Sequence, residues 1–249
     1  YLGFPGGMAG YLSLFVIQFF HAPVNGSILL ALLAGLLVFT VNRVLSRFYT
    51  PPVTTVLQYV PAFFFILLHN RYEHDLRADI ILIFTLAFAA LFMTVLHRKP
   101  VTRLLFLAVS NGLLFWLFGS MAVFLFTLLV MLSEFPVRGN RSRLPVLLFQ
   151  LVAGLLPVWL IVARPAWWSV QTGLPASLYP GLDQKTLAII WIYYGTVPFL
   201  LLFPVLAPKI PRLQRLLHTA GGIVRPALQA VLLRVMAVLI PCLVLLSGG

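Results

Sequence analysis

Eight apolar segments, separated by short loops that carry most of the charge, constrain what this chain can fold into. They cover residues 24–42, 54–69, 78–96, 104–118, 120–133, 145–163, 187–207 and 227–246. Most approach the ~20 residues that a helix needs to cross the hydrocarbon core of a bilayer. The segments therefore predict an all-α fold, a polytopic bundle of about eight transmembrane helices.

The composition excludes an ordinary water-soluble enzyme. Of the 249 residues, 61% are hydrophobic and 9% are charged, whereas a typical soluble domain has about 45–50% and about 25%. We therefore interpret residues 1–249 as a single transmembrane domain, with an extracytoplasmic interfacial segment over 1–23 and spans over 24–246.

The N-terminal segment predicts a helix that lies on the membrane surface. Met8–Phe20 is apolar but has only 13 residues, too few for an ordinary span. Pro5-Gly6-Gly7 and His21-Ala22-Pro23 bound it on either side. Because this segment starts outside the membrane, we expect a further span upstream of Tyr1 and a longer protein.

The apolar run from Leu104 to Leu132 predicts a hairpin. Its 29 residues exceed one ordinary span, and Gly119-Ser120 lies near its middle. We therefore expect a tight hairpin of two short helices, with a single tilted helix as the alternative.

Positive charge predicts the orientation of the chain. The sequence has 17 Lys and Arg against 5 Asp and Glu. If 24–42 runs from outside to inside, twelve basic residues fall in cytoplasmic loops and four fall outside. This bias follows the positive-inside rule and predicts a bacterial cytoplasmic (inner) membrane protein, with no nucleic-acid partner. Merging the hairpin into one helix would move a basic cluster outside, so the charge favours the hairpin.

The outer loop after the second segment carries the candidate catalytic groups. These weak candidates are Glu73, His74, Asp75 and Asp79. They offer carboxylates and an imidazole for a general base, whereas the alternative is a solvated loop with an acidic helix start. His69 and His74 are five residues apart, which does not match a metal-binding pattern, and Cys242 is a single cysteine. We therefore expect no metal and no cofactor.

Other polar residues are candidates for ligand binding. They are Arg164, Trp167, Trp168 and Lys185 in the outer loop, Arg234 in the last segment and Asn111 within 104–118. The loop residues form either a lid over a lipid or sugar phosphate or an interfacial aromatic belt. Arg234 either binds a lipid phosphate, snorkels to the cytoplasmic surface or pairs with Glu134. Asn111 either binds substrate or joins helices.

Prolines interrupt several segments: Pro61, Pro157, Pro198, Pro204 and Pro241. Broken helices are typical of transporters, although proline is also common in membrane helices. Basic residues within 208–226 predict contact with anionic lipid headgroups.

The N-terminal string resembles a known family. Phe4-Pro5-Gly6-Gly7-Met8-Ala9-Gly10-Tyr11-Leu12, then Gln18-Phe19-Phe20 and Pro23, is similar to a motif of an uncharacterised multi-span membrane protein family of the Bacteroides group. The likeness extends more faintly to His69, Tyr72, Gly119 and Glu134. Gly10 stands where that family often has Glu. The resemblance implies a preceding transmembrane helix and a helical soluble region after the last span, and it implies no activity.

The architecture also resembles integral-membrane glycosyltransferases that use polyprenyl-phosphate sugars. Those enzymes carry a catalytic acid in the first extracytoplasmic loop, and residues 1–23 contain none. Three functions therefore stay open: a membrane-embedded subunit or scaffold, which we favour; a lipid-linked glycosyl or phospholipid transferase; and a transporter. The expected partners are the lipid bilayer with its anionic headgroups, and a polyprenyl-phosphate lipid or a membrane protein.

Overall fold

The computed structural model describes residues 5–49, 51–69, 76–95, 99–134, 143–163 and 184–206, and within these ranges it contains helices and no strand. The predicted all-α fold is confirmed for this part of the chain. The elements are α1 Gly7–Ile17, η1 Gln18–His21, α2 Pro23–Leu45, α3 Pro51–Leu57, α4 Tyr59–His69, α5 Arg77–Val95, α6 Pro100–Phe118, α7 Ser120–Glu134, α8 Arg143–Ala163 and α10 Gln184–Leu206.

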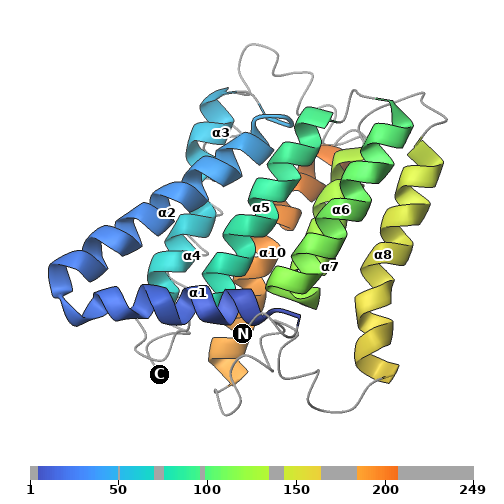
Figure 1. Cartoon of the computed structure of the whole chain (residues 1–249). Helices are drawn as coiled ribbons and strands as arrows, with labels where there is room; N and C mark the ends of the chain where they lie inside the picture. Colours follow the sequence, from blue (N-terminus) through green and yellow to red (C-terminus); the bar gives the residue numbers. More distant parts are fainter. Residues whose placement is uncertain are drawn as a thin grey trace.

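The long helices stand side by side, and α1 lies across one end of them (Figure 1). We call this the α1 end and the opposite end the distal end. The helix α2 runs toward the distal end, α4 returns, and the direction alternates through α5, α6, α7, α8 and α10 (Figure 1). This alternation is the arrangement that successive membrane crossings require.

Three helices are long and apolar enough to cross a membrane, judged within the described ranges by length and composition. They are Val24–Leu45, Arg77–Val95 and Pro100–Phe118. Shorter apolar helices match four further predicted segments: Thr54–His69, Ser120–Glu134, Leu144–Gly154 and Ile189–Leu202. The segment 227–246 lies outside the described residues.

The predicted hairpin is confirmed. A single residue, Gly119, separates α6 from α7. Its backbone has φ of 86° and ψ of −175°, a conformation that residues other than glycine rarely adopt. Its N–H donates to the Phe115 carbonyl at 3.0 Å and closes the end of α6. The helix α6 begins at Pro100 rather than at 104, because proline suits the first turn of a helix.

The expectation that prolines interrupt the apolar segments is confirmed at one position and wrong at three others. The segment 54–69 is two helices, because Pro61 has no N–H for the carbonyl of Leu57, and α3 ends at that residue. In contrast, α8 continues through Pro157, and α10 continues through Pro198 and Pro204. These prolines do not break their helices, and Pro241 lies outside the described residues.

The N-terminal helix forms where the sequence predicts it. Gly6 starts it with a positive φ of 82°, and the Gly6 N–H donates to the Trp116 carbonyl at the end of α6, at 3.0 Å. Ala9 and Ser13 are buried against the bundle. At the other end, Ala22 is extended and Pro23 opens α2. The segment is therefore fixed across the α1 end of the bundle.

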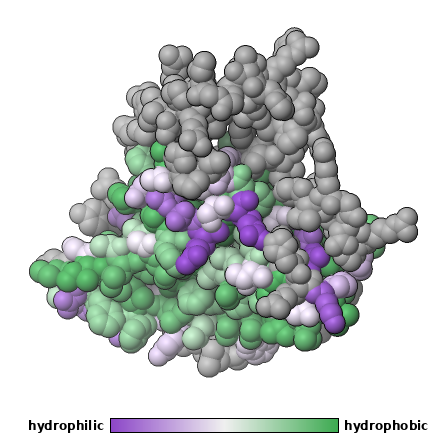
Figure 2. All heavy atoms as spheres, turned by 90° about the horizontal axis from the view of Figure 1, so that it is seen from above, coloured by the Kyte–Doolittle hydropathy of each residue, from purple (hydrophilic) through white to green (hydrophobic). Residues whose placement is uncertain are grey.

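Burial divides the helices into a centre and a rim. In the apolar 18-residue stretch of α5, 61% of the residues are buried inside the protein. The corresponding shares in α2 and α6 are 28% and 33%. Large apolar side chains are exposed along the whole of α2, at Val24, Ile28, Leu32, Leu36 and Phe39. They are equally exposed along α6, at Val101, Leu105, Val109, Leu113 and Trp116. Figure 2, a view onto the distal end, shows that hydrophobic residues cover most of the described surface and that hydrophilic ones lie near its middle and at a few places along its edge.

Candidate functional site

Three contacts between polar side chains join described helices, and the first lies at the α1 end between α4 and α5. His69 is the last residue of α4, and Asp79 is in the first turn of α5. The His69 Nε2 lies 3.6 Å from the Asp79 Oδ2, and the His69 Nδ1 lies 2.9 Å from the Phe65 carbonyl oxygen. The Asp79 side chain is fully buried.

This geometry favours a structural contact between helices over a catalytic pair. Both ring nitrogens of His69 face acceptors, the Phe65 carbonyl oxygen and the Asp79 carboxylate. A catalytic His–Asp pair instead keeps one ring nitrogen directed at a nucleophile or substrate. Asp79, a predicted catalytic candidate, therefore lies where it holds α4 against α5. Glu73, His74 and Asp75 lie outside the described residues.

The second polar contact joins α6 to α7 near the distal end. The Arg103 guanidinium in the first turn of α6 donates to the Glu134 carboxylate at the end of α7. Both side chains are buried, at 4% and 1% exposed. Glu134 was expected to be available to Arg234, but its partner within the described residues is Arg103. Arg234 lies outside them.

The third contact joins α6, α7 and α8 and contains Asn111. The Asn111 Nδ2 donates to the Gln150 Oε1 and to the Leu107 carbonyl, each at 2.9 Å. In return, the Gln150 Nε2 donates to the Asn111 Oδ1 at 3.3 Å and to the Thr127 Oγ1 at 3.0 Å. The donors of both amides are thus engaged. Of the two interpretations of Asn111, this geometry supports the contact between helices.

Sequence reasoning missed Gln150 and Thr127. A signal was present, because Gln150 is an amide in the apolar segment 145–163, just as Asn111 is in the segment 104–118. Buried amides in apolar segments need hydrogen-bond partners, so two such segments in adjacent positions predict a pair. Which helices were adjacent was not predictable from the sequence.

Of the other predicted ligand-binding residues, only the backbone of Lys185 is described. It lies in the first turn of α10. Arg164, Trp167 and Trp168 lie outside the described residues. Within the described ranges, no group of three His, Cys, Asp or Glu side chains is placed to hold a metal ion.

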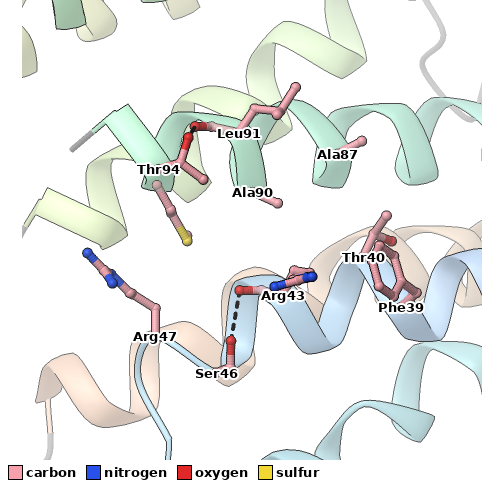
Figure 3. Close-up of a pocket in the computed structure, with 10 residues that line it drawn as sticks. Phe39, Thr40, Arg43, Ser46, Arg47, Ala87, Ala90, Leu91 and Thr94 are labelled. Carbon is pink, nitrogen blue, oxygen red and sulfur yellow. Dashed lines mark hydrogen bonds between the residues drawn. The ribbon is translucent and has the colours of Figure 1, made fainter. Parts of the chain in front are cut away.

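A groove between α2 and α5 at the distal end is lined by two basic side chains. It has a volume of about 730 Å³ and is lined by Phe39, Thr40, Arg43, Ser46 and Arg47 from α2 and the turn after it, and by Ala87, Ala90, Leu91, Met93 and Thr94 from α5. Figure 3 shows both arginines on the α2 side, with the small and apolar α5 side chains opposite. We call it the basic groove.

A second groove lies between α2 and α4 and is mainly apolar. It has a volume of about 450 Å³, and its lining residues include Leu30, Ala34, Phe63 and Ile66. His69 is its one ionisable lining residue. Since the ring nitrogens of His69 face Phe65 and Asp79, this groove presents an apolar surface.

Tyr49 fixes the turn after α2 to α10. Its hydroxyl donates to the Leu200 carbonyl at 2.5 Å. Burial raises the pKa of Tyr49 well above its ordinary value, so the phenol keeps its proton at any physiological pH. The distal end of α2, next to the basic groove, is therefore anchored to the last described helix.

Comparison with known proteins gives a family but no activity. No curated protein and no solved structure matches the chain. One family model matches residues 1–244, which is nearly the whole chain, and its description is a family of unknown function. The chain belongs to this family, DUF6057.

Proposed function

We propose that this chain is a polytopic protein of the bacterial cytoplasmic membrane that acts as a membrane-embedded subunit or scaffold. The observation that carries the proposal is the use of polar groups inside the bundle. His69 and Asp79, Arg103 and Glu134, and Asn111 with Gln150 are each engaged between helices. Groups arranged in this way stabilise a bundle and are not directed at a substrate.

The exposed apolar side chains support insertion into a membrane. On α2 and on α6 they recur every third or fourth residue from one end of the helix to the other, which keeps them on one face of a helix. From Val24 to Phe39 the stripe extends about 22 Å, at 1.5 Å per residue. Exposed apolar surface on this scale requires lipid or another protein around it.

The alternating helix directions and the charge bias support about eight spans. With 24–42 running outside to inside, the distal end is cytoplasmic and α1 lies on the outer surface. Arg43, Arg47, Lys99 and Arg103 then all fall at the cytoplasmic side, as the positive-inside rule requires. The segment 227–246 would be the eighth span.

A subunit needs a face for its partner, and the two apolar stripes are the candidates. Truncating side chains to alanine keeps a helix apolar, so it has little effect against lipid but removes packing against a protein. Two triple variants test the two faces, I28A/L32A/L36A on α2 and L105A/V109A/L113A on α6. Each replaces three exposed apolar side chains of one helix by alanine.

The test is native mass spectrometry of the tagged full-length protein, extracted from its own membrane in mild detergent. We expect a stoichiometric membrane-protein partner, and we expect one triple variant to lose it while the other retains it. A co-purifying polyprenyl-phosphate lipid or glycolipid without a protein partner would contradict the proposal and favour the transferase. Retention of the partner by both variants would contradict the assignment of these faces.

A further inference from the structure

We propose that the basic groove binds one anionic phospholipid of the inner leaflet, with its phosphate on Arg43 and Arg47 and an acyl chain along α5. The inference rests on the membrane orientation proposed above. The ligand chemistry follows from what the lining residues offer, taken in three steps.

The charge of the groove selects an anion. Arg43 lies in the last turn of α2 and Arg47 in the turn after it, and both line the groove. Both side chains are exposed, and the described lining residues include no carboxylate.

The other polar side chains of the groove contribute little to ligand binding. The Thr40 hydroxyl donates to the Leu37 carbonyl at 2.9 Å, Ser46 donates to the Arg43 carbonyl at 3.1 Å, and Thr94 donates to the Leu91 carbonyl at 2.7 Å. The two guanidiniums therefore provide the polar recognition. A guanidinium has five N–H donors in a planar fork, which matches the oxygens of a phosphate.

The rest of the groove selects a chain rather than a soluble phosphate. Opposite the arginines, Ala87 and Ala90 present small apolar side chains from α5 (Figure 3), and Leu91 and Met93 add apolar lining. Phe39 extends the apolar lining toward the middle of α2, and the Arg43 guanidinium carbon lies 5.3 Å from the centre of its ring. A phosphate at the membrane surface joined to a hydrocarbon chain is the ligand that fits both halves.

Binding can be measured on the purified full-length protein in a non-ionic detergent. The protein is titrated with dioleoyl phosphatidylglycerol or with dioleoyl phosphatidylcholine, and bound lipids are counted by native mass spectrometry. We expect one saturable phosphatidylglycerol site. In R43Q/R47Q its affinity should fall by about thirtyfold, since each cation near a lipid headgroup contributes about 1 kcal/mol. The control R98Q/K99Q removes the same charge from the next loop and should change the affinity less than about twofold.

A second pair of variants tests the apolar half. A87W fills the groove and keeps both arginines, and L32W adds the same side chain on the exposed face of α2. We expect A87W to weaken phosphatidylglycerol binding at least as much as R43Q/R47Q, and L32W to leave it unchanged. A competition experiment with inorganic phosphate distinguishes a lipid headgroup from free phosphate as the ligand. We expect that inorganic phosphate alone does not displace the lipid.

Three results would overturn the proposal: equal binding of phosphatidylcholine, an unaltered affinity in R43Q/R47Q, or an unaltered affinity in A87W. In the last case the arginines would attract headgroups without a seated chain. Because the titration is done in detergent, it depends neither on the orientation of the chain nor on a protein partner. Failure of this inference is therefore distinguishable from failure of the proposed subunit function.

Discussion

Arg103, in the first turn of α6, forms a buried ion pair with Glu134, the last residue of α7. The two residues are 31 positions apart, and in one continuous helix they would be separated by about 46 Å. Their contact requires α6 and α7 to be antiparallel. It therefore excludes the single long helix.

This pair predicts a strong dependence of stability on both partners. The variants R103M and E134L each leave one buried charge without its counterion, and each should lower the free energy of unfolding by about 3 kcal/mol. The double variant R103M/E134L removes both charges and should lose far less than the sum of the single losses. Unfolding of the detergent-solubilised protein by SDS titration measures all three, and strictly additive losses would contradict the ion pair.

The amide pair between α6 and α8 predicts a smaller effect. Gln150→Leu removes the partner of Asn111 and of Thr127 at once, and it should cost about 1 kcal/mol, because hydrogen bonds between membrane helices contribute little individually. Gln18→Leu, on the exposed face of η1, is the matched control. The same SDS titration reads both variants, and an equal loss in the control would contradict the pairing.

Gly154 on α8 predicts a close contact with α7. A Cβ at this position would lie 2.7 Å from the Thr127 Cγ2, so Gly154→Ala forces the two helices apart. Overpacking of this kind costs about 1–3 kcal/mol. In the background of Thr127→Ala the same substitution should cost less, because the obstructing atoms are gone. Gly112→Ala, which meets nothing within 4 Å, should be neutral or stabilising.

The turn between α6 and α7 predicts a requirement for glycine at position 119. Gly119→Ala places a Cβ on a backbone with φ of 86°, which costs about 1–3 kcal/mol. Gly35→Ala in the interior of α2 also meets nothing within 4 Å and should gain stability instead. Thermal unfolding followed by light scattering compares the two variants. A stable Gly119→Ala protein with an unaltered fold would contradict the turn geometry.

Much of the fold could be predicted from the sequence because long apolar helices are defined by local properties. These properties depend on neighbouring residues in the sequence. They are the length of each apolar run, the glycine between α6 and α7, and the proline and glycine residues on either side of α1. Helix ends were less predictable: Pro100 and Pro23 lie at helix starts, while Pro61 lies in the first turn of α4 and α3 ends before it, at Leu57. Whether a proline breaks a membrane helix depends on its neighbours, which is why the prediction was wrong for Pro157 and Pro198.

The polar sites were less predictable, because the role of each polar residue depends on which residue of another helix it contacts. Asp79 was identified as an acid near the outer surface, but its burial against His69 follows from the packing of α4 on α5. Glu134 was one of three alternatives considered for Arg234, and its contact with Arg103 follows from the hairpin of α6 and α7. Arg43 and Arg47 were counted only for orientation, because the groove beside them requires the adjacency of α2 and α5.

Membrane topology tests the central claim, an alternating helical bundle with its distal end in the cytoplasm, most directly. Reporter fusions are made at Gly139, between α7 and α8, and at Thr172, between α8 and α10. Green fluorescent protein matures in the cytoplasm, and alkaline phosphatase is active only outside it. We predict fluorescence at Gly139 and phosphatase activity at Thr172. Reporters that place both positions on the same side would contradict the alternation of the helices and the orientation of the basic groove.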